Sequence, residues 1–181
     1  MYVYDFKTKL SGKDLVLEIA ASEKYIESIK ITGGGRPKSN RKMPPVLTDK
    51  ILYNELNLLP HLYKLINLLD KYFSAKNVEF NDIPINFSLY SDFSSEILIK
   101  TQTIKYNEIL SYKQLAIKAG YDAKYSRACA AVLSVNKTPI VVPCHRVIYT
   151  NGKLGGWSGG GWKDFKSALL LLEKNKNFYK N

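Results

Sequence analysis

The sequence has few of the residues that build disulfide frameworks, zinc sites or membrane spans. Its 181 residues include only two cysteines, Cys129 and Cys144, and two histidines, His61 and His145. Two cysteines do not make the disulfide framework of a small secreted domain, and they lack the spacing of a structural zinc site. No apolar run approaches the ~20 residues that a transmembrane helix needs. We therefore expect free thiols in a reducing compartment, with no bound metal and no membrane partner.

The amino terminus does not read as a secretion signal. The first ten residues alternate in character and carry Asp5, Lys7 and Lys9 in place of an uninterrupted apolar stretch. The chain is long enough to bury a real core, as one ordinary domain or as two small ones. These observations predict a soluble, cytoplasmic protein.

Acidic residues are scarce relative to basic ones. The chain holds 27 lysines and arginines against 16 acidic residues, a net charge of +11. The excess is uneven, because residues 91–181 hold 14 basic and 6 acidic residues, whereas residues 1–90 hold 13 and 10. A basic half indicates a polyanionic partner, nucleic acid first. A lysine-rich solvated surface would give the same count, so charge alone does not decide.

The first half of the sequence has the patterns of a small α/β unit. Leu15, Leu17 and Ile19 alternate with polar or small neighbours as in a strand, after a hairpin turn at Ser11-Gly12. The run 25–31 reads as another strand, and the run from Thr48 to about Phe73 reads as helical. Its apolar face consists of Leu62, Leu65, Ile66, Leu69 and Phe73. We predict an N-terminal α/β domain with an antiparallel sheet over residues 1–80 and a linker over residues 81–91.

Residues 92–181 read as a mainly helical domain, which makes the fold class α+β followed by α. A helix is expected from Asp92 to about Thr103. Ser111 and Gln114 form a capping box that opens a second helix, and Gly120 ends it. A third helix over residues 123–135 follows after a short turn, which predicts a helix-turn-helix. Helical hairpins that bind nothing share this pattern.

The helix expected over residues 123–135 has an unusual surface. Ser126, Ala128 and Ala130 are small, and Arg127 lies among them. Small side chains allow close approach either to a DNA backbone or to a neighbouring helix. Cys129, in the same helix, is interpreted as a small buried apolar residue.

The segment 139–148 carries the most chemically informative pattern. We expect Ile140 to Val142 to form a short buried strand, or a strand-like segment, that delivers Cys144. The neighbouring His145 and Arg146 make an electropositive setting, which favours the thiolate over the thiol. Residues adjacent in sequence need not touch, however, so the Cys-His pair alone leaves both catalysis and chance open.

The longer string decides the interpretation. P-C-H-R-V-I at 143–148, followed by the glycine-rich run 151–160, resembles the active-site signature of the O6-alkylguanine-DNA alkyltransferases. The resemblance extends to 109–116, to 126–128, to Asn136 and to 169–173, and thus covers roughly residues 90–175. It implies DNA repair by direct reversal, in which an alkyl group passes irreversibly from O6-alkylguanine in double-stranded DNA to one cysteine. No cofactor is expected, and the protein should act as a monomer.

The resemblance also implies roles for individual residues. Cys144 would be the nucleophile, His145 would ionise it through a water molecule, and Glu173 would orient His145. The product is a thioether that water does not hydrolyse, so the protein would be consumed. Tyr112 would act on the neighbouring phosphate and help to protonate the leaving guanine.

Further residues would bind the DNA. The family binds the minor groove through the helix-turn-helix and flips the damaged nucleotide out of the duplex. Arg127 would fill the space that the nucleotide leaves, with Ser126, Ala128 and Ala130 lying in the groove, while Asn136 would tie the helix-turn-helix to the cysteine segment. The guanine pocket would comprise Pro139, Val147, Trp157, Ser158 and Gly159.

The sequence departs from the family pattern at three places. Trp157 stands where tyrosine is common, Gly161-Trp162 lengthens the loop before the last helix, and Asn107 stands where glycine is usual. Three other functions fit parts of the pattern: a non-catalytic alkyltransferase-like lesion binder, a helix-turn-helix regulator with a merely buried Cys144, and a cysteine hydrolase. The presence of Cys144 argues against the first, and no oxyanion-hole signature supports the last.

Overall fold

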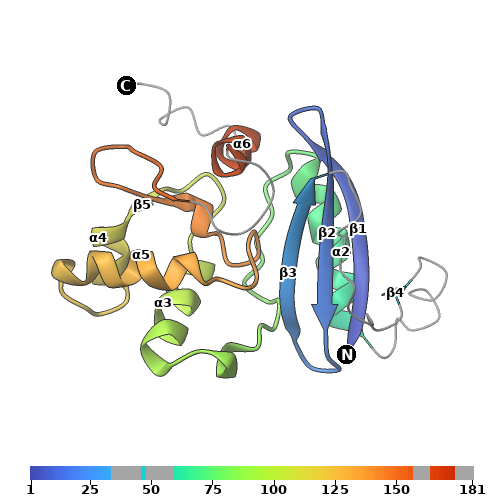
Figure 1. Ribbon diagram of the computed structural model, residues 1–181, viewed down its shortest axis with the longest axis horizontal. Coiled ribbons are helices and arrows are strands. Elements are labelled where there is room, and N and C mark those ends of the chain that lie inside the picture. The colour runs from blue at the N-terminus through green and yellow to red at the C-terminus, as the bar shows by residue number, and fades with distance from the viewer. Residues whose placement is uncertain (34–45, 48–58, 157–163, 174–181) are drawn as a thin grey trace.

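The protein places a sheet and its covering helix beside a group of shorter helices, as Figure 1 shows. The structure is a computed structural model and describes residues 1–33, 46–47, 59–156 and 164–173. The predicted fold class is confirmed, with an antiparallel sheet first and helices after it. No helix in these ranges is long and apolar enough to cross a membrane.

The sheet is a meander of three antiparallel strands with a short fourth strand at its edge. β1 (Tyr2–Leu10), β2 (Lys13–Ala21) and β3 (Ile26–Gly33) pair in sequence order, and β4 (Val46–Leu47) pairs parallel to β1. Ser11 and Gly12 form the predicted turn between β1 and β2, with φ angles of 51° and 75°. A two-residue hairpin turn needs positive φ angles because its twist must match that of the strands.

Helix α2 (Pro60–Phe73) covers one face of the sheet. Proline is tolerated at its first position because the first N–H groups of a helix have no intrahelical partner. The expected helix is confirmed over this range, while residues 48–58 lie outside the described ranges. Leu62, Leu65 and Leu69 are buried as predicted, but the fully buried aromatic ring at the end of the stripe is Tyr72. Phe73 is only partly buried and stacks on Phe6.

The segment predicted as a linker, residues 81–91, is bonded to the sheet. Ile83 and Ile85 are buried, and the Ile26 N–H donates to the Pro84 carbonyl at 2.9 Å. The segment contains a short 3-10 helix, η1 (Phe87–Leu89). It therefore joins the two halves as packed chain, and the division into domains stays a prediction.

The second half consists of short helices and one small parallel sheet. β5 (Leu110–Ser111) pairs with β6 (Val147–Ile148) in that sheet, and β6 directly follows the 3-10 helix η3 (Cys144–Arg146). The elements are α3 (Asp92–Gln102), β5 (Leu110–Ser111), α4 (Tyr112–Lys118), η2 (Ala123–Tyr125), α5 (Ser126–Ser134), η3 (Cys144–Arg146), β6 (Val147–Ile148) and α6 (Phe165–Leu172).

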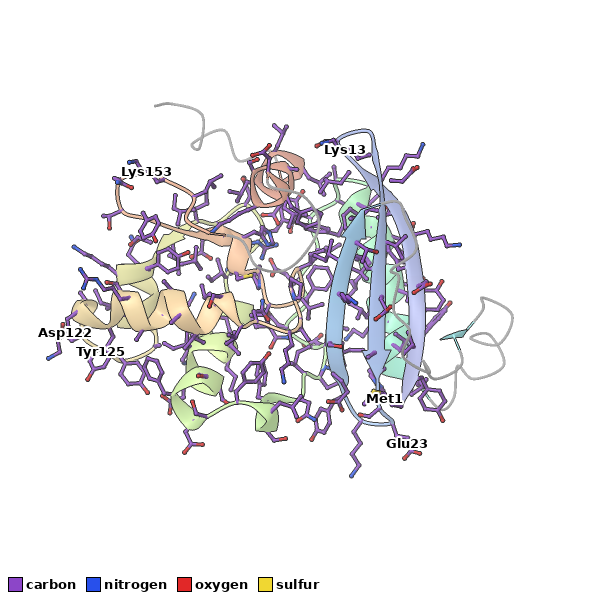
Figure 2. The ribbon with its side chains drawn as sticks, in the orientation of Figure 1. Met1, Lys13, Glu23, Asp122, Tyr125 and Lys153 are labelled. Atoms are coloured by element: carbon purple, nitrogen blue, oxygen red, sulfur yellow. The ribbon has the colours of Figure 1, made fainter. Side chains whose placement is uncertain are left out.

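The predicted helix signals around α4 are confirmed in detail. The Ser111 Oγ accepts the Gln114 N–H at 3.2 Å, and the Gln114 Oε1 accepts the Ser111 N–H at 2.7 Å. Gly120 follows the helix with φ 86°, a conformation that costs glycine little. The helix predicted over residues 123–135 is split into η2 and α5. In Figure 2, Asp122 and Tyr125 mark this connection at the end of the molecule farthest from the sheet.

The expected strand at Ile140 to Val142 is wrong. Ile140 has φ 76°, and the Val142 N–H donates back to the Thr138 carbonyl at 2.9 Å, so the chain turns here. Proline cannot donate to a sheet ladder, and Pro139 and Pro143 flank the segment on both sides. Cys144 is consequently delivered by a buried turn.

Candidate active site

Cys144 lies at the start of η3 and is tied to the end of α5. Its side chain is 8% exposed. The Asn136 side-chain amide donates to the Cys144 Sγ at 3.2 Å and to the Val142 carbonyl at 2.9 Å. Asn136 follows the end of α5 directly, so this one amide links α5 to the cysteine turn as the sequence predicted.

Burial controls the ionisation of the Cys144 thiol. Loss of solvent raises its pKa, while the Asn136 hydrogen bond and the charge of Lys166 oppose the rise. Neighbouring groups therefore do favour the thiolate, as expected, but burial outweighs them and the net direction is a raised pKa. The resting form is a buried thiol, which needs a base to become a nucleophile.

His145 is the base nearest in the chain, and its geometry fixes its tautomer. Its Nε2 lies 2.8 Å from the Glu173 Oε1, and both side chains are fully buried. A carboxylate only accepts hydrogen bonds, so Nε2 carries the proton and Nδ1 carries a lone pair. Burial lowers the His145 pKa against the opposing effect of Glu173. Of the side chains that the structure describes, His145 Nδ1 is the one buried polar atom without a hydrogen-bond partner.

Glu173 is the centre of a buried polar network. Its carboxylate accepts hydrogen bonds from Arg146 at 3.0–3.2 Å, from the Asn107 N–H at 3.2 Å and from the Tyr72 hydroxyl at 2.8 Å. Burial alone would raise the Glu173 pKa, but it is outweighed by hydrogen bonds from His145 and Arg146, by the charge of Arg146 and by that of His145 when protonated, which hold the pKa at about 2. The network thus keeps a carboxylate ionised in the protein interior.

Asn107 explains one departure from the family pattern. Its φ is 64°, in the left-handed region that glycine adopts most easily. Asparagine is one of the few other residues that visit this region routinely. The turn before Tyr112 therefore keeps its shape, and its N–H still reaches Glu173.

Sequence reasoning missed the pairing of Arg146. The side chain is 2% exposed, and its Nη1 donates to the Ile104 carbonyl at 2.5 Å while its other nitrogens bind Glu173. The available signal was an arginine inside a run of buried apolar residues. A buried charge needs a counter-ion, but the sequence does not say which acidic residue supplies it.

Lys166 was also missed, although it lies close to the chemistry. It is 3% exposed, and its Nζ donates to the carbonyls of Val147 at 2.6 Å and Leu154 at 2.7 Å. Burial lowers its pKa to about 8, and the charge of Cys144 opposes this shift. Val147 was predicted to form part of the guanine pocket, and its carbonyl accepts a hydrogen bond from Lys166.

A pocket of about 470 Å³ opens between α4, α5 and the turn after β6. Pockets of 300–1,000 Å³ are the usual size of small-molecule sites. Four of the five residues predicted to bind DNA line it: Tyr112, Ser126, Arg127 and Ala130. The other lining residues that the structure describes are Lys113, Tyr149 and Thr150.

Tyr112 is a buried phenol that lines the pocket, and Cys144 is not among the described residues that line it. Burial raises its pKa to about 12, and the charges of Tyr149 and Cys144 add to the rise. The phenol therefore keeps its proton at neutral pH. Gly155, with φ 76°, lies against it, because a Cβ atom at Gly155 would be 2.9 Å from the Tyr112 Oη and 3.1 Å from the Tyr149 ring.

The remaining predicted residues are placed as follows. Ala128 is half-buried and is not among the described residues that line the pocket. Pro139 is buried in the turn before Cys144, and Cys129 is fully buried in α5 as expected. Trp157, Ser158, Gly159 and the Gly161-Trp162 stretch lie outside the described residues. Within the described ranges no group of three or more His, Cys, Asp and Glu side chains could hold a metal ion.

Comparisons with known proteins point to one family. Residues 92–175 match the family model described as the DNA-binding domain of 6-O-methylguanine DNA methyltransferase. The methylated-DNA–protein-cysteine methyltransferase of Cricetulus griseus is 30% identical over 162 residues, which are 87% of this chain and 76% of that protein. The enzyme of the same name from Metallosphaera sedula is 38% identical over 109 residues, 60% of this chain and 65% of that protein.

A solved structure has the same fold across nearly the whole chain. The Mycobacterium tuberculosis OGT, crystallised in complex with DNA, superposes with a TM-score of 0.71 at 24% identity, over 96% of this chain and 93% of that chain. The sequence likeness to the Cricetulus griseus enzyme extends over both halves of the fold described above. The chain therefore belongs to the methylated-DNA–protein-cysteine methyltransferase family.

Proposed function

We propose that this protein repairs DNA directly by taking the alkyl group from O6-alkylguanine in double-stranded DNA onto the Cys144 Sγ. Each molecule reacts once and needs no cofactor. The observation that carries the proposal is the pairing of a buried thiol with a neutral histidine on one 3-10 turn, where Glu173 holds the histidine and its Nδ1 has no partner in the described part of the chain.

The reaction follows from these atoms. His145 Nδ1 takes the thiol proton through a water molecule, and the Sγ attacks the alkyl carbon. A carbon–sulfur bond forms, the bond between that carbon and guanine O6 breaks, and its electron pair leaves with guanine. Tyr112, which keeps its proton at neutral pH, donates to the departing base. The thiol thus loses one proton to His145 and guanine gains one from Tyr112, and the balance closes when the His145 proton returns to the Tyr112 oxygen through solvent.

Recognition of DNA is assigned to α5 and the pocket beneath it. The Arg127 side chain is exposed at the pocket, and Ser126 and Ala130 are small enough for a groove floor. In this proposal the damaged nucleotide leaves the duplex and enters the pocket, and Arg127 occupies the vacated place in the stack. Ala128 would approach the groove beside them. The protein would act in the cytoplasm as a monomer.

The direct test is intact-mass and peptide-mass measurement after incubation with duplex DNA that contains O6-methylguanine. One methyl group should appear on the peptide that contains Cys144. Cys144→Ser should bind the same duplex and take up no methyl group. Cys129→Ser is the matched control, because it removes the other thiol and should still be labelled at Cys144. A methyl group on another residue, or none in the wild type, would rule the proposal out.

The flipping step has a separate test. Arg127→Ala should slow transfer from duplex DNA about tenfold or more, but change the reaction with free O6-benzylguanine by less than about twofold, because the free base needs no extrusion. Lys118→Ala on α4 is the control, since this lysine is exposed and is not among the described residues that line the pocket. Equal losses with both substrates in Arg127→Ala would contradict the role of Arg127.

A further inference from the structure

One side chain of the N-terminal half reaches the reaction machinery. Tyr72, in the last turn of α2, is fully buried, and its hydroxyl donates to the Glu173 Oε1 at 2.8 Å. The same hydroxyl oxygen lies 3.4 Å from His145 Nε2. Tyr72 therefore touches both partners of the His-Glu pair, from an element 101 residues away from Glu173 in the sequence.

The Tyr72 ring is held from several sides. Edge-to-face contacts join it to Phe80 at 5.8 Å and to Tyr106 at 6.1 Å between ring centroids, and Phe73 packs at 5.3 Å. A ring fixed in this way cannot swing its hydroxyl elsewhere without repacking the core. The direction of the hydroxyl is set by the fold before any substrate binds.

The hydrogen-bond roles at Glu173 leave one arrangement for the phenol. Glu173 is ionised and only accepts, and His145 Nε2–H donates to the same Oε1 atom at 2.8 Å. The Tyr72 hydroxyl must therefore donate to that oxygen as well. Donors from both halves of the molecule thus converge on Oε1, and Arg146 donates to both carboxylate oxygens, to Oε1 at 3.0 and 3.2 Å and to Oε2 at 3.1 Å.

We infer that the Tyr72 hydroxyl is a positioning group for alkyl transfer: it fixes the Glu173 carboxylate that orients the His145 base. This inference rests on the proposed function. It gives the N-terminal half a part in the reaction, since α2 supplies a fixed donor to a pair built by η3 and the end of α6. Tyr72 touches neither the thiol nor DNA, so it acts only through Glu173 and His145.

A simpler explanation is that a buried phenol needs some acceptor, and that Glu173 happens to provide it. The two explanations differ in what happens to His145. If the phenol tunes the pair, its removal leaves more negative charge on Oε1, which favours the imidazolium. The acid limb of the rate–pH profile should then move to higher pH. The other ionisable groups that act on His145, namely Glu173, Arg146 and Lys166, stay in place, while Tyr106 acts on Tyr72 and Cys144 acts on Lys166.

The test compares Tyr72→Phe with Tyr106→Phe, in the full-length protein. Both changes delete one hydroxyl from the same aromatic group, but the Tyr106 hydroxyl donates to the Leu172 carbonyl rather than to Glu173. Transfer from O6-methylguanine duplex should be about tenfold slower in Tyr72→Phe, with an upward shift of the acid limb. DNA affinity should stay within about twofold. Tyr106→Phe should change neither the rate by more than about twofold nor the profile.

A second readout does not depend on turnover. The chain has only two histidines, so ring-nitrogen NMR resolves His145 directly, and its titration midpoint should rise in Tyr72→Phe but not in Tyr106→Phe. Unchanged midpoints and rates in Tyr72→Phe would overturn the inference, even if the wild type is methylated on Cys144. Absence of methylation in the wild type would instead defeat the proposed function.

Discussion

The two halves of the molecule bury different kinds of side chain. In the described part of residues 1–91, the buried side chains are hydrophobic apart from His61, with only the hydroxyls of Tyr4 and Tyr72 added. The second half also buries a set of polar and charged groups: Thr101, Gln102, Ser111, Asn136, Thr138, His145, Arg146, Lys166 and Glu173. The first core is held by packing, and the second by packing plus a polar network in which, among the described side chains, His145 Nδ1 alone lacks a partner.

This contrast separates two tasks that a small protein must perform. An apolar core tolerates many substitutions of similar volume because its energy is non-directional. A buried polar network tolerates few, because each removed partner leaves another group unsatisfied. The second half is therefore more sensitive to substitution, because its polar network holds a neutral base and an ionised carboxylate in place.

The largest effect on the free energy of unfolding should come from removing the Arg146 charge from the buried polar network. Arg146→Met should lower the free energy of unfolding by about 3–5 kcal/mol, since Glu173 would be left as an uncompensated buried charge. Chemical denaturation at pH 7 measures this. A loss below about 1 kcal/mol would mean that the charges of the second half are not what stabilises it.

A side-chain truncation in the apolar first half tests the same contrast between the two cores. Leu17 in β2 is fully buried, and Leu17→Ala should cost about 3 kcal/mol through lost burial and the cavity left behind. The fraction of folded molecules that take up a methyl group should be unchanged. Selective loss of transfer in folded Leu17→Ala would show that the two halves are not separable in this way.

Low pH should destabilise the folded protein through the second half, where Glu173 lies. The Glu173 pKa is about 2 in the folded protein, against an ordinary value of 4.5. A carboxyl group with a lowered pKa stabilises the folded state at pH values above its ordinary pKa. That contribution is lost as the pH falls from about 4.5 to about 2. We expect a loss on the order of 2 kcal/mol over this window. Glu173→Gln should show a flatter stability profile there than the wild type does.

The smallest expected change in stability concerns the pocket. Gly155→Ala should cost about 1 kcal/mol because alanine is strained at φ 76°. The added methyl group would also press on the Tyr112 hydroxyl, so transfer should slow about tenfold. Gly12→Ala is the control: it carries similar strain at φ 75° with nothing within 4 Å of the new atom. Equal transfer rates in the two variants would show that Tyr112 tolerates displacement.

Local signals in the sequence predicted local structure well. The Ser11-Gly12 turn, the Ser111–Gln114 capping box and the end of α4 at Gly120 each depend on a few neighbouring residues. The cysteine motif was found because its residues are contiguous. The strand expected at Ile140 to Val142 failed because apolar composition was weighed above the prolines on either side.

The long-range pairings could not be predicted from the sequence. Arg146 and Glu173 are 27 residues apart, and Tyr72 and Glu173 are 101 apart. No periodicity or spacing specifies such partners, since they meet only when the tertiary fold brings α2, η3 and α6 together. The burial of Lys166 was missed for the same reason, because its two carbonyl partners lie in β6 and in the segment that follows it.

The backbone at Ile140 has a consequence for how the nucleophile is held. A β-branched residue with φ 76° is unfavourable by itself, yet the Ile140 side chain is completely enclosed. The turn before Cys144 therefore exists because the surrounding core demands it, against the local preference of the chain. A short peptide spanning residues 136–148 would contain the whole cysteine motif and none of its arrangement, so reactivity belongs to the folded domain alone.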